Sequence, residues 1–146
     1  MTRGSEPPER IRASVICVQD RELLCVRLRD PNSGIARLFP PGGAIEPGES
    51  ASAAAQRETL EETGYRVVIA SGPAHVARYP YTWNGTLRRV TTHFFRATLV
   101  GGKHDSVPVH DASYHKGVVW LPLAELDLRL GFEPAILSAV RALVAR

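Results

Sequence analysis

The chain of 146 residues has no apolar run near the roughly 20 residues needed to cross a membrane. It also has no internal repeat, and its first ten residues, MTRGSEPPER, lack the apolar stretch of a signal peptide. With 44% hydrophobic and 23% charged residues, the composition excludes disordered and collagen-like classes. We therefore expect a cytoplasmic protein without a membrane partner, built as a flexible tail over residues 1–10 and a single domain over residues 11–146.

Cysteine is scarce, because the chain contains only Cys17 and Cys25. Two residues form neither a metal signature nor a disulfide framework. If a hairpin places Val18 opposite Leu23, the two sulfur atoms point to opposite faces of the sheet. We interpret both as small core residues in a reducing compartment.

A strong charge of one sign is also missing, since the net charge is only +3. This surplus is too small to indicate nucleic acid as a partner. Its distribution is uneven, however, because residues 43–65 contain five glutamates and one arginine, a net charge of −4. The rest of the chain therefore carries +7, and this basic surround favours an anionic small molecule over nucleic acid.

The expected elements follow one another as strands, a helix, strands and a helix. This order predicts an α+β fold with a mixed sheet between helices. A helix is expected from Ser50, a good N-cap, to Thr63, because Gly64 follows as a C-terminal stop. Asn84 and Gly85 predict a hairpin turn. We expect strands at residues 11–18, 23–27, 65–70, 74–81, 86–99 and 118–121, a loop at 101–116, a helical turn at 122–126 and a closing helix at 132–145.

Three carboxylates gather on the first of these helices. Glu58, Glu61 and Glu62 have the spacing i, i+3 and i+4, so they fall within an arc of about 100°. They repel one another and also lie at the negative end of the helix dipole, which a sequence selected for stability alone would avoid. Glutamates on a surface helix usually form only a solvated face. Clustered hard oxygen ligands, however, suit Mg²⁺ or Mn²⁺ together with substrate phosphates.

The surrounding residues decide between these interpretations. Gly43, Glu49 and residues 57–65, RETLEETGY, resemble the Nudix box, G-x5-E-x7-R-E-U-x-E-E-x-G-U. Thr59 departs from the pattern, which prefers an aliphatic residue there, and we expect neighbouring Leu60 to take part of its packing role. The resemblance implies an α/β/α sandwich and a divalent-metal-dependent hydrolase of a nucleoside diphosphate linked to a group X.

The resemblance also assigns roles within the box. It implies Glu58, Glu61, Glu62 and the carbonyl of Gly43 as ligands of Mg²⁺ or Mn²⁺. Arg57 would pair with Glu49 and orient the other carboxylates, so the catalytic group comprises Glu61, Glu58, Arg57 and Glu49.

The general base is left open between the box and the later loop. We favour a box glutamate, with His115 or Asp111 as contributors from the loop. The other loop candidates are His104, Asp105 and His110, and simple exposure to solvent is the alternative for each loop residue.

Substrate contacts are expected from aromatic and basic residues after the box. Tyr81 and Trp83, with Tyr79 beside them, either stack on a base or cover the sheet. Arg88 and Arg89 are adjacent on a strand, so only one of them can face a given side. The predicted substrate-binding residues are Arg37, Tyr81, Trp83, Arg88 and His115.

The expected substrate is a (d)NTP or a related small nucleotide, with a dinucleoside polyphosphate or a nucleotide sugar second. The alternative function is a Nudix-fold nucleotide-binding or regulatory module without catalysis, although modules of that kind usually have damaged boxes. A homodimer is compatible with the sequence, but no feature of the chain specifies one.

Overall fold

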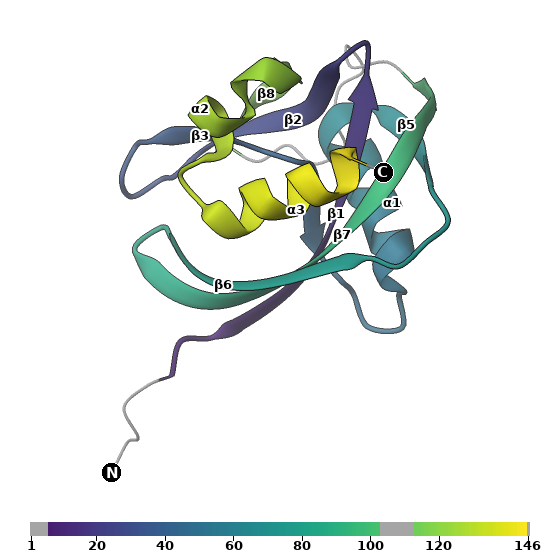
Figure 1. The fold of residues 1–146 in the computed structure, drawn as a ribbon. Coiled ribbons are helices and arrows are strands. Elements are labelled where there is room, and N and C mark those ends of the chain that lie inside the picture. The colour runs from purple at the N-terminus through teal and green to yellow at the C-terminus, as the bar shows by residue number, and fades with distance from the viewer. Residues whose placement is uncertain (1–5, 103–112, 146) are drawn as a thin grey trace.

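The computed structural model describes residues 6–102 and 113–145, and these contain eight strands and three α-helices (Figure 1). The strands are β1 (Glu9–Gln19), β2 (Glu22–Arg29), β3 (Ala36–Phe39), β4 (Gly42–Ala44), β5 (Tyr65–Ile69), β6 (His75–Trp83), β7 (Thr86–Gly102) and β8 (His115–Pro122). The helices are α1 (Ala51–Thr63), α2 (Leu126–Leu130), preceded by a 3₁₀ turn at Leu123–Glu125, and α3 (Pro134–Val144).

The sheet is mixed and is organised around β1 and β7. These two strands run parallel, with Arg10 beside Val90 and Arg12 beside Thr92. Strand β7 also pairs antiparallel with β6 and β5, whereas β4 pairs with β1 on its other side. At its end β1 turns into β2, which carries β3 and β8. The parallel pair thus places residues from the start of the chain beside residues about eighty positions later.

Helices cover both faces of this sheet, as Figure 1 shows with α3 in front of β1 and β7 and α1 behind them. One buried cluster joins Ala54 and Ala55 of α1 to the strands, and the other joins α2 and α3 to the opposite face. Cys17 belongs to the first cluster and Cys25 to the second, and Val18 pairs with Leu23. The predicted α/β/α sandwich and the opposed cysteines are therefore confirmed. None of the described helices is long and apolar enough to cross a membrane.

Several local predictions differ from the structure. Strand β3 and helix α2 were not predicted, because short elements carry little periodicity. Strand β1 begins at Glu9, so residues 9 and 10, assigned to the tail, pair with β7 instead. The prediction of a loop over residues 101–116 is wrong at both ends, since β7 continues to Gly102 and β8 begins at His115.

Candidate functional site

Helix α1 presents the box glutamates, and both of its ends are fixed as the sequence predicts. The Ser50 side chain accepts a hydrogen bond from the Ala53 backbone N–H at 3.1 Å. Gly64 takes a left-handed conformation with φ of 78°, and its N–H donates to the Leu60 carbonyl. These caps fix where the helix begins and ends, and the box glutamates lie in its last two turns.

Thr59, the departure from the box pattern, is fully buried in α1. Its hydroxyl donates to the Ala55 carbonyl at 2.7 Å, so the polar group is satisfied within the helix. Leu60 is only half-buried. Thr59 therefore packs inward itself, and the expectation that Leu60 takes part of its packing role stays a prediction.

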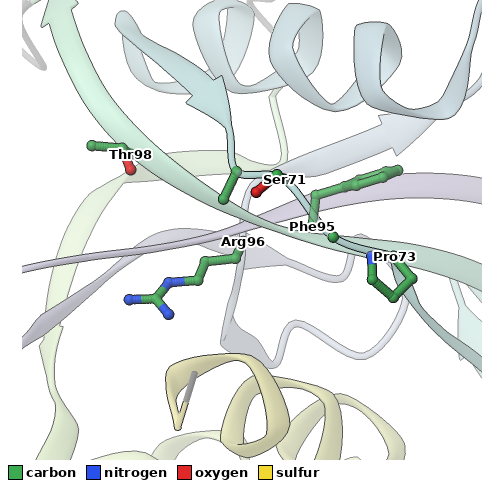
Figure 2. Close-up of a pocket in the computed structure, with 7 residues that line it drawn as sticks. Ser71, Pro73, Phe95, Arg96 and Thr98 are labelled. Carbon is green, nitrogen blue, oxygen red and sulfur yellow. The ribbon is translucent and has the colours of Figure 1, made fainter.

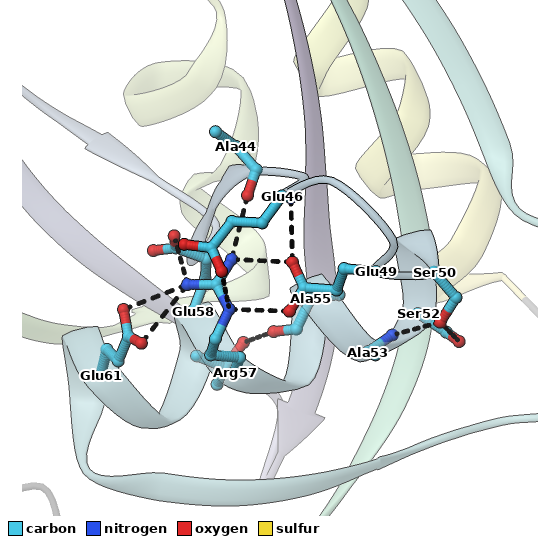
Figure 3. Close-up of polar contacts among 11 residues, drawn as sticks. Ala44, Glu46, Glu49, Ser50, Ser52, Ala53, Ala55, Arg57, Glu58 and Glu61 are labelled. Carbon is cyan, nitrogen blue, oxygen red and sulfur yellow. Dashed lines mark hydrogen bonds and ion pairs between the residues drawn. The ribbon is translucent and has the colours of Figure 1, made fainter.

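The guanidinium of Arg57 joins the loop before α1 to the carboxylates of the helix (Figure 3). Its Nε and Nη2 donate to the two oxygens of Glu49 at 2.8 and 3.0 Å. Its Nη1 donates to Glu58 at 3.0 Å and to Glu61 at 3.3 Å. The Nη2 atom also donates to the Ala44 carbonyl at 3.0 Å. One side chain thus fixes the positions of three carboxylates, including the pair with Glu49 that the resemblance implies.

This ion pairing changes the acidity of the partners. The hydrogen bonds from Arg57 lower the pKa of Glu49 to about 2, helped by the backbone N–H of Glu46. The pKa of Arg57 itself is raised, mainly by Glu49 and then by Glu58 and Glu61. Glu49 and Arg57 are therefore both charged over the whole physiological pH range.

Two glycines in β4 allow the close approach of α1 and β1. A Cβ atom at Gly43 would lie 2.5 and 2.6 Å from the two carboxylate oxygens of Glu58. A Cβ atom at Gly42 would lie 2.5 Å from the Ala13 carbonyl oxygen of β1. Any larger residue at either position would displace its neighbour, so the Glu58 carboxylate occupies space that only glycine leaves free.

Glu62 has a different environment from Glu58 and Glu61. Its side chain is only 5% exposed and accepts a hydrogen bond from the Gly42 N–H at 2.9 Å. Burial raises the pKa of Glu62 to about 8, although the hydrogen bond from Gly42 and the charge of Arg12 act in the opposite direction. This carboxyl group is thus mostly protonated at neutral pH unless a cation binds beside it.

The donor set agrees with a divalent cation, because carboxylates and a backbone carbonyl are the ligands of Mg²⁺ and Mn²⁺. Because residue 43 is a glycine, the Glu58 carboxylate lies against the same residue whose backbone carbonyl is the expected ligand. Within residues 6–102 and 113–145, however, no three acidic, histidine or cysteine side chains converge closely enough to hold an ion. Glu58 and Glu61 converge on Arg57, and Glu62 turns toward Gly42.

A cavity of about 460 Å³ opens beside these carboxylates. Glu58, Glu62, Gly42 and Gly43 form its acidic end, whereas Glu61, Glu49 and Arg57 lie outside its lining. The remaining walls are basic and aromatic, and they include Arg10, Arg12, Arg88, Phe39, Tyr79, Tyr81, Trp83 and Tyr114. The acidic box and a pocket large enough for a nucleotide are therefore continuous.

The aromatic residues both cover the sheet and line the cavity. Tyr79 is buried, and its hydroxyl lies 3.0 Å from that of Thr92. Tyr81 packs edge-on against Phe39 with ring centroids 6.0 Å apart. Trp83 packs edge-on against Tyr114 at 5.6 Å. Each aromatic ring is thus held by a neighbour while part of it faces the cavity.

The other predicted substrate contacts fall into two groups. Tyr81, Trp83 and Arg88 line the cavity, but Arg37 and His115 do not. Arg37 is exposed and lies 4.7 Å from the centre of the Phe132 ring. His115 belongs to β8 rather than to a loop, and it pairs there with Leu28. The loop candidates His104, Asp105, His110 and Asp111 lie outside the described residues.

Sequence reasoning missed Arg10 and Arg12 as cavity residues. Their spacing of two in a β-branched segment was the available signal, because it puts both side chains on one face of a strand. Which face turned toward the box depended on the pairing of β1 with β4 and β7.

A second, smaller hollow of about 240 Å³ lies where the turn after β5 meets β7 (Figure 2). Ser71, Pro73, Phe95 and Arg96 are among its lining residues, and the lining contains no carboxylate. It is therefore separate in chemistry from the acidic cavity.

Comparison with known proteins agrees with this geometry. The model of the NUDIX domain matches residues 8–143. The chain is 27% identical over 114 residues to "Putative 8-oxo-dGTP diphosphatase" of Bacillus subtilis, an alignment that covers 78% of the chain and 66% of that protein. It is 28% identical to the RNA pyrophosphohydrolase of Erythrobacter litoralis, with 96% of the chain and 95% of that protein covered. The chain thus spans slightly less than two thirds of the B. subtilis relative.

Solved structures show the same fold. The NUDIX hydrolase from Nitrosomonas europaea has a TM-score of 0.68 at 26% identity, over 96% of this chain and 90% of that one. The family model spans nearly the whole chain, including the box, the caps of α1 and the strands that wall the cavity. The chain therefore belongs to the NUDIX domain family.

Proposed function

We propose that the chain hydrolyses a phosphoanhydride bond of a nucleotide, in a reaction that depends on Mg²⁺ or Mn²⁺ at the box carboxylates. The protein is a hydrolase of phosphorus anhydrides. The observation that carries this proposal is the position of Glu58, which Arg57 and Gly43 hold on the wall of a cavity with basic and aromatic sides.

The residues have distinct tasks in this reaction. Arg57 holds Glu49, Glu58 and Glu61 together through hydrogen bonds, so that these carboxylates are close to one another before substrate arrives. Glu58 lines the cavity and accepts the proton of the attacking water as general base. Glu58, Glu61, Glu62 and the Gly43 carbonyl would hold the divalent ion, which would supply neutralisation of phosphoryl charge and a lowered pKa for water.

The substrate is a (d)NTP or a related small nucleotide, with dinucleoside polyphosphates and nucleotide sugars second. The name of the B. subtilis relative supports a nucleoside triphosphate, and the aromatic wall supports a base. The two buried free cysteines support a cytoplasmic location. The absence of a nucleic acid partner and the formation of a homodimer stay predictions.

The test is a panel of nucleotides incubated with Mg²⁺ or Mn²⁺, with products identified by mass. We expect wild-type protein to release two phosphorylated products, and Glu61→Gln and Glu62→Gln to lose this activity. Glu125→Gln is the matched control, because Glu125 lies in the 3₁₀ turn outside the cavity lining. Full turnover by both box variants would contradict the metal assignment. Tight binding without turnover by wild type would favour the non-catalytic binding module.

A further inference from the structure

Three arginines, Arg10, Arg12 and Arg88, line the cavity without a counter-charge in direct contact. None of the three forms an ion pair or a side-chain hydrogen bond with any residue in the described parts of the chain. The Nε atom of Arg88 is buried and has no hydrogen-bond partner among those residues. Burial, followed by the charges of Arg88 and Arg12, lowers the pKa of Arg10. The cluster therefore repels itself and is a favourable seat for an anion.

The strand register orders these cations along the cavity. Arg12 pairs with Ala44, next to the glycine that contacts Glu58. Arg10 lies two residues earlier and pairs with Val90, and Arg88 lies two residues before Val90 on β7. Arg12 and Arg88 are thus offset by four residues along parallel strands, about 13 Å at the backbone. Along the strands, Arg12 is therefore the nearest of the three to the box and Arg88 the farthest from it.

Arg88, at the end of this series, lies beside the aromatic wall of the cavity. Arg88 pairs with Tyr81 across β6 and β7, and Val90 pairs with Tyr79. Because side chains alternate along a strand, Arg88 and Val90 share the face on which Tyr79 and Tyr81 lie. The cavity therefore presents carboxylates near Arg12, and the aromatic rings of β6 lie beside Arg10 and Arg88.

A diphosphate uses only part of this series. In a nucleoside diphosphate sugar the two phosphates are adjacent, so together they reach only one part of a row of cations that extends over about 13 Å at the backbone. Guanidinium groups beyond this reach would remain without anionic partners in a half-buried wall, at a cost to the bound state. A longer phosphate chain supplies both the extra charge and the extra length.

We infer that Arg10, Arg12 and Arg88 form a subsite for additional phosphates, so that the substrate is a nucleotide with three or more linked phosphates rather than a nucleotide sugar. This inference rests on the proposed function for its placement of the cleaved bond at the carboxylates. The base then lies against Tyr81 and Trp83, and the phosphates run past the arginines toward Glu58.

Arg89 provides a matched control for this subsite. It is the next residue on β7, so its side chain faces the opposite way, where its Nε donates to the Pro7 carbonyl at 3.0 Å. Arg88→Gln and Arg89→Gln remove the same charge from adjacent positions. Only Arg88→Gln removes a positive charge from the cavity wall.

The experiment measures binding of inorganic tripolyphosphate and inorganic pyrophosphate by calorimetry without divalent metal, so that no turnover intervenes. We expect wild type to bind tripolyphosphate at least about tenfold more tightly than pyrophosphate. Arg88→Gln and Arg10→Gln should each weaken tripolyphosphate binding by about tenfold, whereas Arg89→Gln should not. Equal affinity of wild type for the two anions, or an equal loss in Arg89→Gln, would overturn the subsite.

Two further measurements separate the possible failures. Thermal unfolding shows whether each variant is folded. Removing one of three repelling cations should leave the melting temperature unchanged or raise it. Arg12→Gln replaces any variant that does not fold. Hydrolysis of ATP, diadenosine tetraphosphate and UDP-glucose is then compared with Mg²⁺. Turnover that favours UDP-glucose would overturn the subsite and leave the proposed function intact. Absence of turnover together with arginine-dependent tripolyphosphate binding would overturn the hydrolase and leave the subsite intact.

Discussion

Arg57 binds Glu49 through two parallel hydrogen bonds, from Nε at 2.8 Å and from Nη2 at 3.0 Å. The pair connects the turn before α1 to the middle of the helix, and the third nitrogen of the same guanidinium reaches Glu58. A lysine could not make these contacts together, because it lacks the planar fork. The geometry of the box thus depends on one arginine and its partner outside the helix.

The first prediction concerns the pH dependence of this pair. The folded-state pKa of Glu49, about 2, is lower than its ordinary value of 4.5, so the pair stabilises the protein above pH 4.5. This stabilisation is lost as the pH falls through about 2. We expect Glu49→Gln to lower the free energy of unfolding in urea at pH 7, and the difference from wild type to shrink between pH 4.5 and pH 3.

Glu46→Gln is the control, since Glu46 is exposed and lies 3.9 Å from the Arg57 Nε. An exposed pair at this distance contributes little, so the variant should unfold like wild type. A deficit in Glu49→Gln that stays constant from pH 7 to pH 3 would contradict the assigned ion pair.

The second prediction concerns Gly43→Ala. The new methyl group would overlap the Glu58 carboxylate and push it from the cavity wall. We expect Mg²⁺-dependent turnover to fall by about 10- to 100-fold, the usual effect of displacing a residue that orients a ligand. Gly101→Ala is the control, because a Cβ atom there meets nothing within 4 Å. Equal kinetics of the two variants would show that the Glu58 position is not needed.

The third prediction follows from the raised pKa of Glu62. With a folded-state pKa of about 8, the carboxyl group is protonated in the metal-free protein at pH 7. Its neutral form favours folding below pH 4.5, and that contribution is lost as the pH rises through about 8. Binding of Mg²⁺ requires the ionised form and should therefore release close to one proton.

Calorimetry of Mg²⁺ binding at pH 7, in buffers with different ionisation enthalpies, measures this proton. Wild type should release it and Glu62→Gln should not. Identical proton release by both proteins would show that Glu62 is not the group that titrates.

The fourth prediction concerns Thr59 and Thr63, both fully buried in α1. Thr59→Val loses only a hydrogen bond to the helix carbonyl of Ala55, so stability should change by less than about 1 kcal/mol. Thr63→Val removes two hydrogen bonds, the one donated to the Thr59 carbonyl and the one accepted from the Tyr65 N–H, and it should cost about 1–3 kcal/mol. Urea unfolding of both variants measures the contrast, and a larger loss at Thr59 would contradict it.

The sequence was sufficient where interactions are local. The helix was predicted from Ser50 and Gly64, and the hairpin from Asn84 and Gly85, because caps and turns depend on backbone conformations that few residues adopt. The opposite faces of Cys17 and Cys25 followed from the strand period and the hairpin register that places Val18 opposite Leu23. The box glutamates were found by their spacing on one helix.

The walls of the cavity could not be predicted in the same way. Arg10 and Arg12 reach the box because β1 pairs with β4 on one side and with β7 on the other, and this register joins distant parts of the chain. Arg37 was predicted by its charge, but the Phe132 ring lies beside its guanidinium outside the cavity lining. The burial that turns Glu62 from a solvated carboxylate into a weak acid likewise depends on β4 closing over it.

The central claim is that water attacks a phosphorus atom at the box carboxylates. It is tested most directly by turnover of the best nucleotide of the panel in ¹⁸O-labelled water with Mg²⁺, with products analysed by mass spectrometry. We predict one ¹⁸O atom in a phosphate of one of the two products, and no products in the Glu61→Gln variant. Products without ¹⁸O in any phosphate, or unchanged labelling by Glu61→Gln, would contradict it.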